Sequence, residues 1–259
     1  MGTTTNLVEP RWNADTDYSA LDWRRIEERS RRNPVAVIPS GAVEVYGPHL
    51  PLGSDGIVAE AIARMVAGRL GAVCTPLIAI GYSGDLMSHP GTLTVSPDAF
   101  RAYYEGVCRS LIRWGFTDLL FLNTHDGNTR LIDQIGLALV DEGVRCMQID
   151  WWRFAVRFGE DVLTTGRWAA GHAGELCTSV VMHVAPHLVS GPGEDFVPED
   201  DPWPGGIERY EDFREVTGSG VLGKPSEASA HKGEVIVGRA VEAIVQAARE
   251  RFGLEVEAV

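Results

Sequence analysis

The chain has 259 residues, of which 44% are hydrophobic and 23% charged, values typical of a soluble globular protein with a substantial core. Its formal net charge is −13, from 23 basic and 36 acidic residues, so binding to nucleic acid or to an anionic membrane surface is not expected. No secretory signal or membrane-spanning run is visible, and four widely spaced cysteines suit a reducing compartment, so a cytoplasmic protein is expected.

Strand-like and helix-like segments alternate along the chain. Short apolar runs predict strands at residues 35–38, 72–80, 118–122 and 145–151. Apolar residues spaced three and four apart, together with capping residues, predict helices at residues 57–70, 96–114, 128–141, 174–184 and 233–252. This alternation predicts an α/β fold with a mainly parallel sheet and helices on both of its faces.

The whole chain, residues 1–259, is expected to form a single domain. Residues 1–30 are predicted to be an N-terminal extension. Residues 190–230 are rich in proline, glycine and acids and are predicted to form a long ordered excursion.

Carboxylates and imidazoles follow the predicted strands, where ligand sites of parallel sheets lie. Glu44 and Asp55 come after the first strand, in a loop that Pro48 and Pro51 restrict, and His125 comes after the third. Alone, loop acids are commonly solvated and a strand-end histidine is commonly structural. Together they form the mixture of oxygen and nitrogen ligands that a divalent metal prefers, so a metal-dependent enzyme is predicted.

A further cluster opens the helix predicted at residues 174–184. His172 could act as a general acid or base, because imidazole titrates near neutral pH. Glu175 falls in the first turn, where a carboxylate could simply complement the helix dipole. Trp151 and Trp152 end the fourth strand and could either wall a pocket or be ordinary core aromatics.

Three segments in this order and spacing resemble the creatininase family of metal-dependent amidohydrolases. They read GAVEVYGPHLPLGSD at residues 41–55, NTHDGN at 123–128 and GHAGELCTS at 171–179, within a match from about residue 35 to about residue 233. The resemblance implies a three-layer αβα sandwich and hydrolysis of a C–N amide bond in a cyclic amide or formamide. It also implies one or two divalent metal ions per chain, with zinc preferred and manganese or iron as alternatives. A homo-oligomer, commonly a hexamer, is implied as well.

The resemblance also implies roles for individual residues. Glu44, Asp55 and His125 would bind the first metal, and Asp55 would bridge to a second. His172 would donate a proton to the leaving nitrogen. The pocket for a small-molecule substrate would include His49, Asp126, Trp151 and Trp152.

Two departures from the family pattern concern the second metal. Tyr46 stands where a histidine ligand is expected, and a phenol is a poorer ligand at neutral pH unless the metal lowers its pKa. Gly127 stands where other members carry a glutamate, so Glu175 would supply the carboxylate. The second site could be weak, empty or completed by Tyr46, His49 or water. A separate departure is Cys177, which stands where many members carry a glutamate. It could be a small buried residue or a reactive thiol.

Three functions therefore compete. The first is an amide hydrolase that uses a metal-activated water. The second is a non-hydrolytic metal- or ligand-binding homologue with an incomplete second metal site, and the third is a lactone-opening hydrolase. Retention of so many ionisable groups at the strand ends favours an enzyme, because burying such groups is costly.

Overall fold

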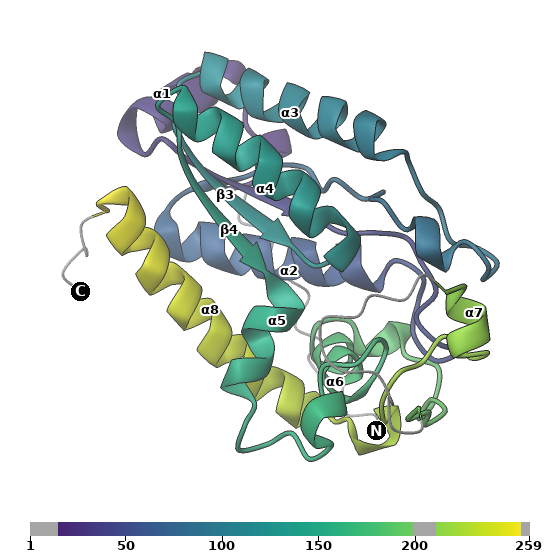
Figure 1. The fold of residues 1–259 in the computed structure, drawn as a ribbon. Helices are drawn as coiled ribbons and strands as arrows, with labels where there is room; N and C mark the ends of the chain where they lie inside the picture. Colours follow the sequence, from purple (N-terminus) through teal and green to yellow (C-terminus); the bar gives the residue numbers. More distant parts are fainter. Residues whose placement is uncertain (1–14, 199–210, 255–259) are drawn as a thin grey trace, which may run out of the picture.

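The computed structural model describes residues 15–198 and 211–254. Four parallel strands form one sheet in the order β2-β1-β3-β4, and helices cover both of its faces (Figure 1). The strands are β1 (Val35–Ser40), β2 (Val73–Cys74), β3 (Asp118–Asn123) and β4 (Arg145–Asp150). The predicted three-layer α/β fold with a mainly parallel sheet is confirmed.

The two faces of the sheet bury different sets of side chains. Val37 and Leu120 point into a core shared with α2 (Ser54–Leu70), α6 (Glu175–Val184) and α8 (Ala230–Phe252). Ile38 and Phe121 point into the opposite core, shared with α1 (Trp23–Arg32), α3 (Pro97–Arg113) and α4 (Asp126–Asp141). Burial on both faces explains why β1 and β3 read as unbroken apolar runs.

The strand order creates a crevice beyond the sheet. The chain passes from β1 through α2 to β2 on one side, and then through α3 to β3 on the other side of β1. The direction of winding therefore reverses between β1 and β3, and ligands bind beyond the carboxyl ends of strands at such a reversal. Glu44 follows β1 and His125 follows β3, so both lie at this point.

Several predicted boundaries are corrected. The strand predicted at residues 72–80 is only two residues long, with one isolated bridge from Ile78 to Ser40, because Pro76 has no N–H for the ladder. The helix predicted from residue 57 begins at Ser54, which moves Asp55 from a loop into the first turn of α2. Likewise α4 begins at Asp126 rather than at residue 128.

Three short or terminal helices were not predicted. They are α1, α5 (Trp151–Ala155) and α7 (Phe213–Val216). Among the predicted regions, residues 1–14 of the N-terminal extension and 199–210 of the excursion lie outside the described residues. In the part of the chain that the structure describes, no helix is both long and apolar enough to cross a membrane.

Candidate metal centre and pocket

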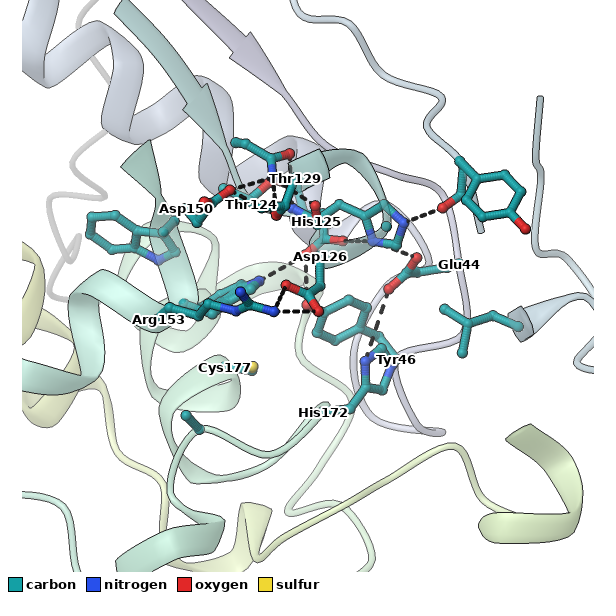
Figure 2. A pocket seen from close by; sticks show the side chains of 18 of the residues that line it. Glu44, Tyr46, Thr124, His125, Asp126, Thr129, Asp150, Arg153, His172 and Cys177 are labelled. Atoms are coloured by element: carbon teal, nitrogen blue, oxygen red, sulfur yellow. Dashed lines mark hydrogen bonds and ion pairs between the residues drawn. The ribbon is translucent and has the colours of Figure 1, made fainter. Parts of the chain in front are cut away.

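Three side chains from different parts of the chain meet at the β1–β3 crevice, and Figure 2 shows two of them, Glu44 and His125, pointing toward each other. One ligand atom each from Glu44, Asp55 and His125 lies within 4.8 Å of the others, and all three residues are buried. His125 Nδ1 lies 2.9 Å from Glu44 Oε2 and 3.3 Å from Asp55 Oδ2. The predicted association of these residues is therefore present in the structure.

Backbone and hydroxyl groups orient His125. Its Nε2 lies 2.7 Å from the carbonyl oxygen of Tyr82, which can only accept, so Nε2 carries a hydrogen and donates. The Nδ1 atom therefore faces the two carboxylates and is the atom available to a metal. Ser83 Oγ donates to Glu44 Oε2 at 2.8 Å and lies 3.2 Å from His125 Nε2. A histidine ligand fixed in this way is typical of protein metal sites.

The two oxygens of the Asp55 carboxylate have different surroundings. Oδ1 accepts hydrogen bonds from the Tyr46 hydroxyl at 2.6 Å and from the Trp152 indole N–H at 3.1 Å. Oδ2 is buried and receives no donor from Tyr46 or Trp152, but lies 3.3 Å from His125 Nδ1. A buried carboxylate oxygen needs a positive partner, which a proton on that nitrogen or a bound cation would supply.

The charges of the side chains in the centre also indicate a bound cation. Burial lowers the pKa of His125, but hydrogen bonds and charges from Asp55 and Glu44 outweigh it and raise that pKa well above its usual value. Without a metal, a proton on Nδ1 thus balances the carboxylates. Burial, followed by the charge of Asp55, raises the pKa of Tyr46 well above its usual value, so Tyr46 is a neutral hydrogen-bond donor. The residues present fit a divalent cation with mixed oxygen and nitrogen ligands.

The loops around the centre are held together by Asn128. Its side-chain Nδ2 donates to the Gly41 carbonyl at 3.0 Å, and its Oδ1 accepts from the Tyr82 N–H at 3.0 Å. Asn128 thus joins the segments that follow β1 and β2 to the first turn of α4. The helix was predicted to begin at this asparagine, whereas Asn128 lies within α4 and bridges the neighbouring loops.

Gly127 is required by the position of the Tyr82 carbonyl. A Cβ added at Gly127 would lie 2.1 Å from that carbonyl oxygen and 2.6 Å from His125 Nε2. Because both distances are too short for a real contact, any side chain here must displace the groups that orient His125.

Gly127→Ala is therefore expected to weaken metal binding about 10- to 100-fold, the range seen when groups that orient a ligand are lost. The dissociation constant measured by competition with a chelating dye checks this. Gly106→Ala is the matched control, because a Cβ added there meets nothing within 4 Å. Equal affinity for both variants would contradict the requirement for glycine at position 127.

A cavity of about 590 Å³ opens beside the centre. His172 lines it, with Nδ1 3.9 Å from Glu44 Oε1 and Nε2 2.6 Å from the Val45 carbonyl oxygen. Because the carbonyl only accepts, Nε2 carries a hydrogen, and Nδ1 is free to exchange a proton with a bound molecule. Aromatic rings form much of the wall, from Tyr46, Tyr82, Trp151, Trp152 and Phe213.

Other polar groups lie at the edge of the cavity (Figure 2). Asp126, predicted to be a pocket residue, lines it and pairs with Arg153 at 2.6 Å. Asp150 accepts hydrogen bonds from Asn123 at 3.0 Å and Thr129 at 2.8 Å. Sequence reasoning missed Ser83, although it follows the second predicted strand and the same strand-end argument could have found it.

Two predicted residues do not lie in this pocket. Glu175 is fully buried, and its carboxylate accepts hydrogen bonds from Thr164, Thr165 and the Lys232 ammonium group, the last at 2.6 Å. This arrangement contradicts its predicted role as a metal ligand, because its oxygens are already engaged on the side of α8. His49 is also buried away from the cavity, with Nε2 2.9 Å from Thr178 Oγ1.

Cys177 lines the cavity as a buried thiol. Burial, followed by the charge of Asp55, raises its pKa to about 12. A thiol that stays protonated at neutral pH is a weak nucleophile, so the structure favours the interpretation of Cys177 as a small buried residue.

Together, the fold and the centre define an α/β protein with a buried cluster able to hold a metal ion at a topological reversal of the sheet. The family model described as creatininase, creatinine amidohydrolase, matches residues 19–248. The chain therefore belongs to the creatininase family and is an enzyme of the amidohydrolase class. The recognition made from the sequence motifs is confirmed.

Individual relatives agree with this membership. The mycofactocin precursor peptide peptidase of Mycobacterium ulcerans is 30% identical over 227 residues, covering 81% of this chain and 82% of the relative. The creatinine amidohydrolase of Pseudomonas putida is 27% identical over 256 residues, covering 90% and 95%. A solved structure described as "Creatininase Mn" is 26% identical with a TM-score of 0.79, covering 92% and 99%. Another, of a mutant creatininase described as "Zn-Zn type", is 25% identical with a TM-score of 0.77, covering 91% and 98%.

Proposed function

We propose that this chain hydrolyses a C–N amide bond of a small molecule, using a divalent metal bound by Glu44, Asp55 and His125. The observation that carries the proposal is the buried cluster of these three ligand atoms within 4.8 Å, which opens onto the cavity. Family membership gives the class of reaction. The manganese and zinc in the descriptions of the matched structures support one of these metals here.

Each residue has a separate part in the reaction. When bound, a divalent metal supplies Lewis acidity, which makes water more acidic and polarises a carbonyl group. Glu44, Asp55 and His125 hold that charge at the wall of the cavity. His172 lies on the other side of Glu44, where its Nδ1 can deliver a proton to the departing nitrogen.

The shape of the cavity supports a small amide or the end of a peptide as substrate. Its volume of about 590 Å³ falls within the range of small-molecule sites, and its aromatic wall excludes water from the bond to be cleaved. The matched relatives act on creatinine and on a precursor peptide, according to their names. A lactone would use the same attacking water, and its departing oxygen could take a proton from the same His172, so it is family membership that favours the amide.

The proposal is tested by assaying the purified metal-loaded protein against a panel of lactams, formamides, short peptides and lactones. Turnover of an amide that stops on chelation and returns with zinc or manganese is the expected result. Turnover of lactones alone would support the lactone-opening alternative. No turnover of any compound by a metal-loaded protein would support the non-hydrolytic alternative.

His172→Gln is expected to separate proton transfer from metal binding. The variant should retain its metal, because His172 is not among the clustered ligand atoms, while kcat falls about 10²- to 10⁴-fold. The loss should shrink for substrates with more acidic leaving groups, which need less help from a proton donor. Metal analysis together with steady-state kinetics checks this, and loss of the metal would contradict the assigned role.

A further inference from the structure

We propose that each chain binds one metal ion, and that Tyr46 and Trp152 occupy the side of Asp55 that a second ion would need. The inference rests on the proposed function, because it takes Glu44, Asp55 and His125 as the metal site. Tyr46 and Trp152 are thereby positioning residues, which hold the carboxylate so that only Oδ2 faces the metal.

The first argument is the hydrogen bonding of Asp55. A carboxylate oxygen has about two lone-pair positions, and both positions of Oδ1 receive a donor, from Tyr46 at 2.6 Å and Trp152 at 3.1 Å. Oδ2 receives neither of these donors and faces His125 Nδ1 at 3.3 Å. For the carboxylate to bridge with one oxygen on each ion, the second ion would have to displace a donor from Oδ1. Tyr46 is almost completely buried, and its hydroxyl would then be left unpaired.

The second argument is the backbone beside His125. Gly127 lies two residues after His125, where a longer side chain could otherwise reach the centre. The Tyr82 carbonyl occupies the place of a Cβ at this position, at 2.1 Å, while accepting the hydrogen bond that fixes His125. The carbonyl that orients the first-metal ligand thus excludes any side-chain ligand from position 127.

The third argument is that the two other residues expected at a second ion, Glu175 and His49, do not line the cavity beside the centre. Glu175 is held by Lys232 and by Thr164 and Thr165, and His49 is held by Thr178. Within residues 15–198 and 211–254, Glu44, Asp55 and His125 form the one group of three or more acidic, histidine or cysteine side chains able to hold a metal. This centre therefore differs from the two-zinc form named for the matched structure.

The decisive measurement is the number of manganese ions per chain in the full protein. The protein is equilibrated with excess Mn²⁺, free metal is removed, and metal is counted by elemental analysis. Electron paramagnetic resonance at low temperature then distinguishes an isolated Mn²⁺ ion from a coupled pair. We expect one ion per chain and the spectrum of an isolated ion. Two ions per chain with a coupled spectrum would overturn the inference.

His125→Ala separates failure of this inference from failure of the proposed function. Two ions in the parent, both lost in the variant, would overturn the single-ion centre but leave the proposed metal site intact. Retention of the parent's full metal content in His125→Ala would overturn both, because all of the metal would then be held elsewhere.

The double variant Tyr46→Phe with Trp152→Phe tests the positioning role. It should still bind one ion, with a dissociation constant for Mn²⁺ raised about 10- to 100-fold, because the orienting hydrogen bonds to Asp55 are lost. Tyr103→Phe, at an exposed tyrosine on α3, is the matched control and should bind like the parent. An unchanged dissociation constant in the double variant would overturn the positioning role.

Discussion

His125→Ala is expected to remove the metal and abolish turnover together. The variant loses the only nitrogen in the clustered ligand set and leaves the carboxylates of Glu44 and Asp55 facing each other. Lewis-acid assistance is worth several kcal/mol, and each 1.36 kcal/mol is a factor of ten in rate, so kcat should fall at least about 10³-fold. Elemental analysis and an amide-hydrolysis assay measure the two losses on the same preparation.

The matched control is His231→Ala. His231 lies on α8 with 78% of its side chain exposed, and its carboxylate neighbour Glu234 lies on the surface of the same helix. This variant should keep the metal content and activity of the parent. Circular dichroism shows whether each variant is folded. If folded His125→Ala kept its full metal content and activity, the site would be assigned to the wrong residues.

The parts of the site that could be predicted from the sequence are those at strand ends. Apolar runs identify β1 and β3, and adjacent parallel strands bring Glu44 and His125 to the same edge. This reasoning depends only on burial and periodicity, which are local in the sequence. Asp55 was expected in the loop after β1, and it reaches the centre from the first turn of α2 because this helix packs against both strands.

The direction of a side chain at a helix start could not be predicted in the same way. Asp55 and Glu175 both lie in first turns, yet Asp55 faces the centre while Glu175 faces Lys232 on α8. The choice depends on α8, which is more than fifty residues away in the chain. The Tyr82 carbonyl was missed for a related reason, because a backbone group carries no pattern that identifies its partner, whereas Ser83 could have been found from its place after the second predicted strand.

The Glu175–Lys232 pair gives the prediction with the largest expected effect on stability. The side chain of Glu175 is completely buried and that of Lys232 is 16% exposed. Lys232→Met leaves the carboxylate in place without its cation, although the hydrogen bonds from Thr164 and Thr165 remain. Removal of one partner of a buried pair typically costs about 3–5 kcal/mol, so a free energy of unfolding lower by about 3 kcal/mol is expected.

Urea unfolding of the parent and the variant measures this difference. Lys224→Met, at an exposed lysine, is the matched control and should unfold like the parent. The double variant Glu175→Gln with Lys232→Met should recover part of the loss, because its neutral amide still accepts hydrogen bonds without a buried charge. A single variant as stable as the parent would contradict the importance of the pair.

The same pair predicts a dependence on pH. Burial raises the pKa of Glu175, but the Lys232 ammonium and the threonine donors more than offset it and leave that pKa below its usual value. A carboxyl group with a lowered pKa stabilises the fold above its unfolded pKa of about 4.3, and the contribution disappears as the pH falls through the folded pKa. The difference between parent and Lys232→Met should therefore be full at pH 7 and shrink below about pH 4. Metal content at pH 7 should be the same in both proteins, since the carboxylate that was predicted to bind a metal instead joins α6 to α8.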